Sequence, residues 1–307
     1  MNPPEAPGGA HGLYDLLKIL ELEPLERNLY RGLNRDIGTG RIFGGQVLAQ
    51  ALVAAQSTVD TPDRMVHSLH GYFILPGDLE APVVYQVERL RDGRSYATRR
   101  VTAIQNGEAI LNMSASFHSH EDGVGHQIDM KDTPPPESLA RDIDLIRDRA
   151  GEIPARVRKV LVQDRPMDHR PVEPEEHFDP KRRKPTQRYW IKTVAPIGND
   201  PRLHQAVLTY ASDYGLLGAA LRPHGVGFRN PNVMIASLDH ALWFHRPFRV
   251  DEWLLYVVES PSSGGGRGFS RGTFFTREGA LVASVAQEGV VRVPIGESGG
   301  IEVDTGS

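Results

Sequence analysis

The chain has 307 residues, and at about 150 residues per domain this length predicts two domains. A formal net charge of −4 gives no electrostatic basis for binding nucleic acid, and the absence of cysteine excludes disulfides, thiolate metal sites and a cysteine nucleophile. No apolar run approaches the roughly 20 residues that span a membrane, and the N-terminal MNPPEAPGGAHG lacks the pattern of a signal peptide, so we expect a cytoplasmic protein.

The first 120 residues predict two helices and a four-stranded meander. A Pro- and Gly-rich tail precedes leucines at helical spacing, which predict a short helix over 13–22. An apolar stripe that starts at Gly44-Gly45 predicts a longer amphipathic helix. Asp92-Gly93 and Asn106-Gly107 are strong hairpin signals between expected strands. The strands are expected at 65–75, 83–91, 94–105 and 108–118.

The rest of the chain predicts a linker and then a second helix-and-meander unit. Residues 121–185 contain Pro134-Pro135-Pro136 and many charges, and we interpret them as a linker with a helix near 137–150. A strand near 186–194 and a helix over 202–222 follow. The remaining strands are expected at 233–246, 253–260, 268–276 and 280–292.

The second half repeats the first. Ser68-Leu69 matches Ser237-Leu238, 169 residues later, and GEAILNMSAS from Gly107 matches GALVASVAQ from Gly279. So long a period indicates a duplicated domain rather than a solenoid. A helix on an antiparallel sheet, twice in one chain, predicts an α+β fold. The expected parts are a tail with a short helix (1–27), the first repeat (28–120), a linker (121–185), the second repeat (186–293) and a flexible tail (294–307).

Three polar side chains interrupt the apolar faces of the second repeat. Asp213 falls on or beside the apolar stripe of the 202–222 helix, Ser237 alternates with apolar residues in its strand, and Gln287 is the one polar side chain on its strand face. A buried carboxylate or amide without a partner is costly, so these groups need partners. Each also has a structural interpretation: an acid at a helix edge, a strand serine, or an amide bonded to a loop backbone.

Together, an acid, a hydroxyl and an amide can hold and activate a water molecule. The carboxylate takes a proton, and the neutral groups orient the oxygen. By the repeat offset, Gly44 of the first half corresponds to Asp213. Ser68 corresponds to Ser237, and Ser116 corresponds to Gln287. The acid and the amide are missing there, so we predict one catalytic repeat and one structural repeat.

Six segments carry a family resemblance: FGGQVLAQAL (from Phe43), VHSLHGYFILPGD (Val66), YASDYGLL (Tyr210), SLDHALWFHRPF (Ser237), EWLLYVVES (Glu252) and RGFSRGTFFTREGALVASVAQEGVVR (Arg267). They resemble the acyl-CoA thioesterase II family, whose members have a double hotdog fold. The segments cover both repeats, so the resemblance implies this fold for nearly the whole chain outside the tails and the linker.

The resemblance also implies a reaction and a set of catalytic residues. The family hydrolyses acyl-CoA to a fatty acid and CoA with an aspartate, a threonine or serine, and a glutamine, which fall on Asp213, Ser237 and Gln287. Asp213 is then the base, and the other two orient the water. Many members have threonine at the position of Ser237, so a difference in rate is expected. The substrate acyl-CoA and a homo-oligomer are implied, and no metal or organic cofactor is.

Two other functions stay open. A hotdog hydratase of enoyl thioesters uses a paired Asp and His, but His204 lies nine residues before Asp213, too far along the helix to share its site. The other alternative is a catalytically inactive acyl-CoA-binding module.

Several further patterns compete for a functional role. Gly296–Gly300 fits G-x-S-x-G but lacks the histidine that a hydrolase needs after it. Asp239, His240 and His245 resemble metal ligands, although neighbours in a strand point to opposite faces; Asp239 is the reserve candidate for the acid. Lys181–Lys184 is expected either to contact the CoA phosphates or a partner, or to be a solvated part of the linker. Gly264–Gly268 is expected either to bind a phosphate through backbone N–H groups or to form a hairpin turn.

Overall fold

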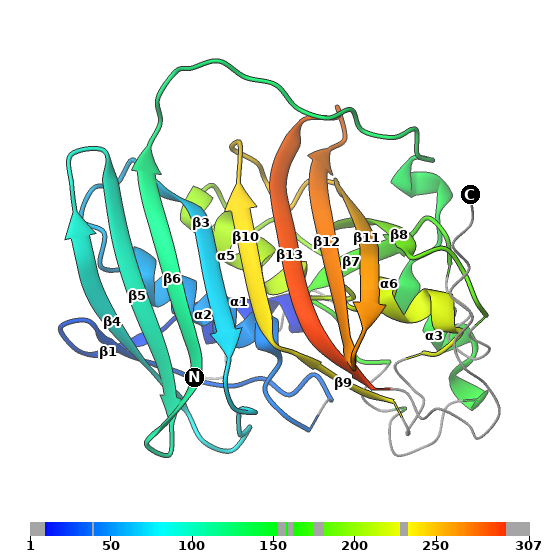
Figure 1. Cartoon of the computed structure of the whole chain (residues 1–307), viewed down its shortest axis with the longest axis horizontal. Coiled ribbons are helices and arrows are strands. Elements are labelled where there is room, and N and C mark those ends of the chain that lie inside the picture. Colours follow the sequence, from blue (N-terminus) through cyan, green and yellow to red (C-terminus); the bar gives the residue numbers. More distant parts are fainter. Residues whose placement is uncertain are drawn as a thin grey trace.

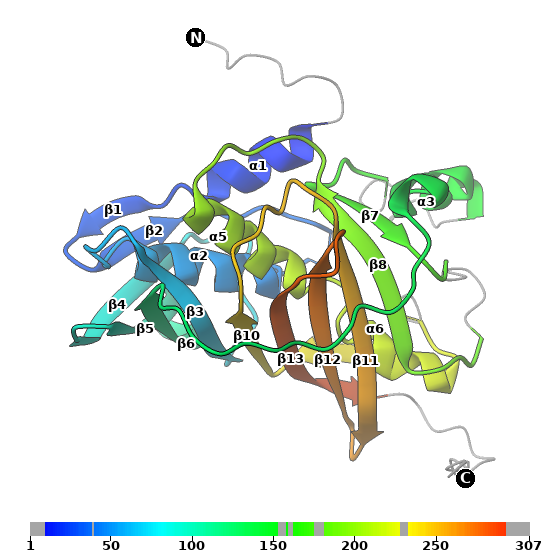
Figure 2. The same cartoon turned by 90° about the horizontal axis from the view of Figure 1, so that it is seen from above.

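The computed structural model describes residues 10–38, 40–152, 158, 162–174, 181–227 and 233–292. Within these residues, thirteen strands form one antiparallel sheet, and the long helices cover one of its faces (Figures 1 and 2). The helix-on-sheet unit occurs once in each half of the chain, which confirms the predicted α+β class.

The first unit has the predicted helix and meander. β4 (Val83–Asp92), β5 (Tyr96–Gln105), β6 (Glu108–Ser119) and β3 (Arg64–Phe73) lie in this order, and α2 (Gly44–Gln56) packs on them. Apolar side chains alternate into the helix-covered face, as in β5, where every second residue is buried. The β5–β6 turn is the predicted Asn-Gly hairpin, because Asn106 and Gly107 both have left-handed φ values of 51° and 83°.

The second unit repeats this plan. β10 (Asp239–Phe244), β13 (Leu281–Arg292), β12 (Arg267–Thr276), β11 (Leu254–Gly264) and β8 (Thr186–Thr193) lie side by side. The helix of this unit is α5 (Pro201–Ser212), which begins where the Asp200 carboxylate accepts the Arg202 N–H at 2.9 Å. The Gly-rich predicted turn joins β11 to β12, so its hairpin interpretation is confirmed.

The two units join through both their sheets and their helices. β3 pairs with β10, with Leu69 opposite Leu242, so the sheet continues from one half into the other. α2 and α5 lie next to each other in the centre of the molecule (Figure 2). The start of α2 contacts the end of α5, so the two helices run in opposite directions.

Strands that the sequence pattern does not predict extend the sheet at both edges. α1 (His11–Leu20) confirms the predicted short helix, and β1 (Glu23–Glu26) and β2 (Leu29–Gly32) then form a hairpin that pairs with β4. At the opposite edge, β7 (Met167–Pro171), from the segment predicted as a linker, pairs with β8. The same segment holds α3 (Asp142–Asp148), within the helix expected near 137–150. The domain boundaries themselves stay predictions.

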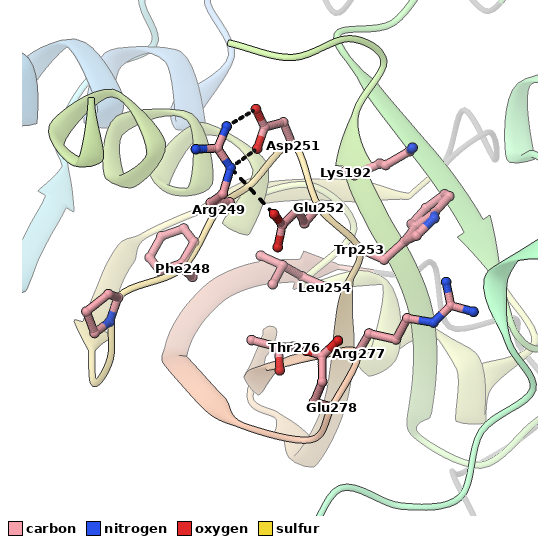
Figure 3. A pocket seen from close by; sticks show the side chains of 11 residues that line it. Lys192, Phe248, Arg249, Asp251, Glu252, Trp253, Leu254, Thr276, Arg277 and Glu278 are labelled. Atoms are coloured by element: carbon pink, nitrogen blue, oxygen red, sulfur yellow. Dashed lines mark hydrogen bonds and ion pairs between the residues drawn. The ribbon is translucent and has the colours of Figure 1, made fainter. Parts of the chain in front are cut away.

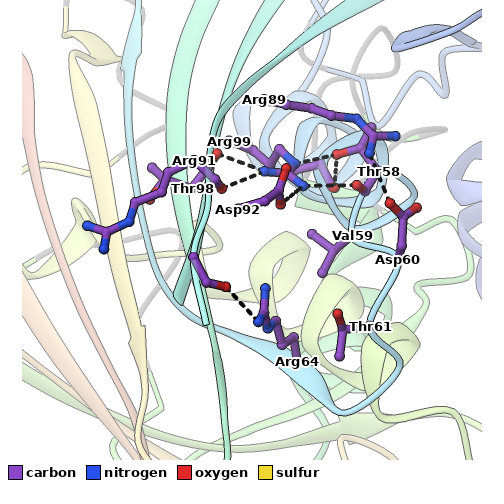
Figure 4. A network of polar contacts seen from close by, with 12 residues as sticks. Thr58, Val59, Asp60, Thr61, Arg64, Arg89, Arg91, Asp92, Thr98 and Arg99 are labelled. Atoms are coloured by element: carbon purple, nitrogen blue, oxygen red, sulfur yellow. Dashed lines mark hydrogen bonds and ion pairs between the residues drawn. The ribbon is translucent and has the colours of Figure 1, made fainter. Parts of the chain in front are cut away.

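A fully buried arginine fixes the end of α2 to the β4–β5 hairpin. Arg99 is 0% exposed, and its Nε donates to Thr58 Oγ1 at 2.8 Å (Figure 4). Its terminal nitrogens donate to the Thr58 carbonyl at 3.0 Å and to the Asp92 carboxylate at 2.6 Å. They also reach the carbonyls of Arg91 and Thr98. Because an unpaired buried guanidinium is very costly, these bonds hold the two elements in one arrangement.

Candidate active site

The helix of the second unit ends earlier than its sequence pattern predicts. α5 stops at Ser212, and Asp213 is its C-cap residue. The prediction of one helix over 202–222 is wrong, because residues 213–217 form a turn before α6 (Gly218–Leu221). Gly215 in this turn has a φ of +74°, which is not a helical conformation and which favours glycine. The turn leaves the Asp213 carboxylate at a helix end, beside the start of α2.

The structure brings Asp213, Ser237 and Gln287 together in one hydrogen-bonded set. The Gln287 amide nitrogen donates to Asp213 Oδ1 at 2.7 Å and to Ser237 Oγ at 2.8 Å. The Gln287 residue is 1% exposed, and the Asp213 side chain is 5% exposed. A carboxylate can only accept hydrogen bonds, so the amide nitrogen rather than its oxygen faces Asp213. The three polar residues singled out in the sequence therefore meet where α5, β9 and β13 converge.

Ser237 is placed by a break in the strand predicted over 233–246. β9 (Met234–Ser237) pairs only with β13, and β10 begins at Asp239 and pairs with both β13 and β3. Between them, the Leu238 N–H donates to the Glu288 carbonyl and the Leu238 carbonyl accepts from Phe73, both at 2.9 Å. The alternation of side chains changes phase at this break, which ordinary strand periodicity does not show.

Gly45 supplies a fourth group. The sequence indicates Gly44-Gly45 for close helix–sheet approach or an oxyanion site, but not as a donor to Asp213. The backbone N–H of Gly45, in the first turn of α2, donates to Asp213 Oδ2 at 2.8 Å. The partial positive charge at a helix N-terminus also stabilises a carboxylate there. No side chain takes part on the Gly45 side, so only the tertiary structure reveals this donor.

Gly44 is not the structural counterpart of Asp213, contrary to the prediction from the repeat offset. Gly44 was matched to Asp213 by offset, but the two are spatial neighbours: a β-carbon on Gly44 would lie 2.9 Å from Asp213 Oδ2. α2 and α5 touch at both ends. At one end, Asp213 after α5 accepts from Gly45 at the start of α2. At the other end, Gln56 at the end of α2 donates to the carbonyl of Arg202 at the start of α5, at 3.4 Å, so Gln56 is the counterpart of Asp213. An amide thus stands in the first repeat where the second has a carboxylate.

The strand register corrects the second match. Ser237 is opposite Gly289, and its counterpart Ser68 is opposite Ser116, so Ser116 corresponds to Gly289 rather than to Gln287. Neither correction places an acid in the first repeat at the position of Asp213.

The residues that resembled metal ligands have separate partners. Asp239 Oδ1 accepts the Glu288 N–H at 2.6 Å, so this carboxylate holds the strand break. His245 Nε2 lies 2.8 Å from Ser284 Oγ. His240 is instead 0% exposed, and its Nδ1 lies 3.8 Å from Asp213 Oδ1. The G-x-S-x-G motif at 296–300 lies outside the described residues.

A cavity of about 1160 Å³ opens onto the three residues. It lies between the two halves, and its lining comes from both. The apolar part of the lining includes Ile42, Phe43, Val47, Phe73, Ile110, Leu216, Leu217 and Ile235. Cationic side chains also reach it: Arg35, Arg41, Arg165, Lys181, Arg183 and Arg222. The cavity can therefore take a ligand with a long apolar part and an anionic part.

The segment predicted as a linker builds one wall of this cavity. Arg165 bonds to the Asp142 carboxylate and donates to the Tyr214 hydroxyl, the latter at 2.8 Å, and the His169 ring lies 4.5 Å from the Tyr214 ring. Burial lowers the pKa of His169 from 6.5 to about 4 and raises the pKa of Tyr214 to about 12. Both rings are therefore uncharged at neutral pH, and Tyr214 directly follows Asp213 in the chain.

A second hollow of about 600 Å³ lies away from these residues (Figure 3). Its charged side chains are largely paired with each other or with neighbours. Arg249 bonds to Asp251 at 2.8 Å, and Arg277 bonds to Glu137 at 2.7 Å. None of Asp213, Ser237 and Gln287 lines this hollow, so the larger cavity is the candidate active site.

Comparison with known proteins gives the family. A family model described as acyl-CoA thioesterase matches residues 157–290, and one described as acyl-CoA thioesterase N-terminal domain matches residues 33–118. Human acyl-coenzyme A thioesterase 8 is 38% identical over 95% of this chain and 97% of its own length. The chain belongs to the acyl-CoA thioesterase family. It is accordingly a hydrolase that acts on thioester bonds, and the predicted family is confirmed.

Other members of the acyl-CoA thioesterase family agree in sequence and fold. Acyl-CoA thioesterase 2 of Haemophilus influenzae is 36% identical, with 91% of this chain and 98% of that protein covered. The crystal structure of the acyl-CoA thioesterase II TesB2 from Mycobacterium marinum is 43% identical, with a TM-score of 0.75 and coverage of 92% and 99%. A hot dog fold protein from Alicyclobacillus acidocaldarius, 20% identical with a TM-score of 0.74, shares the architecture. The predicted double hotdog fold is confirmed.

Proposed function

We propose that the chain hydrolyses acyl-CoA to a free fatty acid and CoA, with Asp213 as the base for a water that Ser237 and Gln287 orient. One observation carries this proposal: a buried carboxylate, an amide and a hydroxyl form a continuous hydrogen-bonded set at the wall of a largely apolar cavity. The family supplies the thioester as the bond to be broken.

The hydrogen-bond directions support a role in holding water. Gln287 donates one N–H to Asp213 and one to Ser237, so the Ser237 oxygen accepts from the amide and its own proton is free to point elsewhere. The buried Gln287 Oε1 has no hydrogen-bond partner among the described residues. A water beside these groups can accept from the serine and donate to the amide oxygen or to the carboxylate. Its lone pair then faces the cavity.

The reaction follows from this placement. The carboxylate takes a proton from the water as the water oxygen attacks the thioester carbonyl carbon. Negative charge then builds on the carbonyl oxygen. Gly44, at the start of α2, lines the cavity, so the positive end of this helix dipole lies where the charge develops. Collapse of the intermediate breaks the C–S bond, and the proton held by Asp213 passes to the leaving sulfur.

The lining of the cavity fits the two ends of the proposed substrate. The apolar side chains from both halves suit an acyl chain, whose transfer from water is favourable by about 0.8 kcal/mol per buried CH₂. The cationic side chains suit the phosphates of CoA. Lys181 and Arg183, part of the basic cluster noted in the sequence, line the cavity, which favours phosphate contact over a purely solvated linker.

The test is Asp213→Asn in a thiol-release assay with a panel of acyl-CoAs. This variant keeps the shape of the side chain but removes the base, so turnover should fall by at least about 100-fold with the thermal unfolding profile retained. Asp239→Asn is the matched comparison, because Asp239 is the neighbouring carboxylate and bonds only to backbone at the strand break. Full turnover in Asp213→Asn, or loss of turnover only in Asp239→Asn, contradicts the assignment.

The two alternatives have less support. A hydratase uses a histidine beside the acid, but His240, the histidine near Asp213, is buried and is not among the described residues that line the cavity. An inactive binding module does not need an acid, a hydroxyl and an amide in contact. Thiol release reports only hydrolysis, and enoyl absorbance followed in parallel reports hydration.

We also propose a cytoplasmic location and a homo-oligomer, as expected from the sequence and from the family resemblance. Among the described residues, none of the helices is long and apolar enough to cross a bilayer. Cell fractionation and light scattering of the purified chain test these two points.

A further inference from the structure

His240 lies beside the catalytic carboxylate but does not line the cavity. Its ring is 0% exposed, with Nδ1 3.8 Å from Asp213 Oδ1 and Nε2 2.9 Å from Ser212 Oγ. Asp213 lines the cavity and His240 does not. The histidine can therefore act on the reaction only through Asp213.

The proton positions on this histidine follow from its partner. Ser212 Oγ also lies 2.9 Å from the Thr209 carbonyl oxygen, which can only accept. Ser212 has a single hydroxyl proton, and donating it to Thr209 leaves the Ser212 oxygen to accept from His240. Both contacts are satisfied when Nε2 carries a proton, and an uncharged ring then has a bare lone pair on Nδ1.

The surroundings keep the ring uncharged. Burial is the largest influence and lowers the pKa of His240, against the opposite effects of the Asp213 and Asp239 carboxylates. Tyr256 of β11 is a further ionisable group nearby: its hydroxyl donates to the Ser212 carbonyl at 2.9 Å, and burial raises its pKa. Both His240 and Tyr256 are thus neutral beneath the carboxylate.

The 3.8 Å separation agrees with this arrangement. An N–H donor facing a carboxylate closes to about 2.7–2.9 Å. Two acceptors with no proton between them stand further apart. Nδ1 has no hydrogen-bond partner among the described residues, so its lone pair remains unused while Asp213 is ionised.

We propose that His240 is a positioning residue that stabilises Asp213 in its protonated form during turnover. This inference rests on the proposed function. When the attacking water gives its proton to the Asp213 carboxylate, the new carboxyl O–H rotates about its C–O bond and donates to His240 Nδ1, and the 3.8 Å separation closes to a hydrogen bond. The proton leaves again for the CoA sulfur when the C–S bond breaks and its electron pair moves to sulfur. No proton is lost or gained over the cycle.

His240 differs from the other two groups that contact Asp213. Gly45 and Gln287 donate hydrogen bonds to the carboxylate in the resting state. His240 Nδ1 becomes a hydrogen-bond partner only after proton transfer, so it stabilises the intermediate and not the resting state.

The experiment compares His240→Gln with His240→Asn. A glutamine amide can reach Ser212 as Nε2 does but offers no acceptor at the Nδ1 position, whereas an asparagine amide oxygen lies near Nδ1. We expect His240→Gln to lower kcat by roughly 10- to 100-fold with KM within about twofold, and His240→Asn to recover part of the loss. The acid limb of the kcat–pH profile should move to lower pH in His240→Gln.

Three results overturn the inference: wild-type kcat in His240→Gln, a loss of kcat with an unmoved acid limb, or no recovery in His240→Asn. Asp213→Asn, assayed in parallel, separates this inference from the proposed function. If Asp213→Asn is inactive and His240→Gln is fully active, only the role of His240 fails. If Asp213→Asn is active, the proposed function fails first.

Nitrogen-15 NMR of the folded wild-type protein gives an answer even where His240→Gln does not fold. The chain has 12 histidines, and the His240 signal is the one displaced by Ser212→Ala, which removes the hydroxyl next to Nε2. A neutral ring with the proton on Nε2 is expected. A proton on Nδ1 overturns the inference.

Discussion

Gly45→Ala tests the contact between the two halves with a single methyl group. The added β-carbon would lie 2.5 Å from the Tyr210 carbonyl oxygen and 2.6 Å from Phe43 Cε1. The Tyr210 carbonyl is helix backbone and cannot rotate away, so the start of α2 has to shift by several tenths of an ångström or more. The bond of 2.8 Å from the Gly45 N–H to Asp213 Oδ2 then lengthens or breaks.

The size of the effect follows from the strength of that bond and from the precision that catalysis needs. A hydrogen bond to a charged group contributes about 1.5–3 kcal/mol, and a displacement of about 1 Å in a catalytic site can cost 100-fold in rate. We expect kcat to fall by about 100-fold. Overpacking costs about 1–3 kcal/mol of stability, which the higher helix propensity of alanine partly offsets by about 1 kcal/mol, so the protein should remain folded.

Thiol release with an acyl-CoA, together with thermal unfolding by circular dichroism, measures both effects. Gly125→Ala is the matched control, because a β-carbon at Gly125 has nothing within 4 Å. It should leave kcat and the unfolding temperature unchanged. A folded Gly45→Ala protein with wild-type kcat would refute the reasoning, since the carboxylate would then not depend on the α2 backbone.

Other changes separate stability from catalysis. Arg99→Met should lower the free energy of unfolding by about 3 kcal/mol, because it leaves buried carbonyls without donors. Arg100→Met, at a half-exposed ion pair, should change the free energy of unfolding by under about 0.5 kcal/mol. Urea titrations measure both, and equal effects would contradict the role of Arg99. Ser237→Ala should lower kcat by roughly 10- to 100-fold and Ser237→Thr should keep most of it, and equal rates would remove the hydroxyl from the mechanism. The pKa of His169 is about 4 in the folded protein and 6.5 for an ordinary histidine, so as the pH falls the unfolded chain binds a proton before the folded one does. The free energy of unfolding should therefore fall as the pH drops from 6.5 towards 4, by up to about 3 kcal/mol. Urea titrations of His169→Phe across that range should lack this loss, and an identical pH dependence in wild type and variant would show that His169 does not titrate as described.

Much of the sheet could be predicted because its strands each bury one face. β3 to β6 and β11 to β13 begin and end within a few residues of the apolar alternation and the hairpin dipeptides. β1 carries no such signal, since all four of its residues are exposed, and β7 lies in a Pro-rich charged segment. A fully exposed edge strand such as β1 has little hydrophobic periodicity of its own.

The candidate site was predictable as far as its side chains were unusual for their positions. Asp213, Ser237 and Gln287 interrupt apolar faces, and such residues need partners. Gly45 gives no comparable signal, because a backbone N–H is present at every residue except proline. The sequence presents His240 only as a possible metal ligand. Its proximity to Asp213 is not predictable, because it depends on the end of α5 and on the strand break at Leu238, both of which are set by tertiary pairing.

The backbone donor from α2 gives the first repeat a share in the proposed chemistry. A comparison of side chains alone assigns that repeat a scaffold role, yet its Gly45 N–H bonds to Asp213, the proposed base. If the chain were expressed as two fragments, neither would contain a whole reaction centre. Turnover after the two fragments are mixed would then report that they associate, so fragment complementation can measure docking between the two repeats.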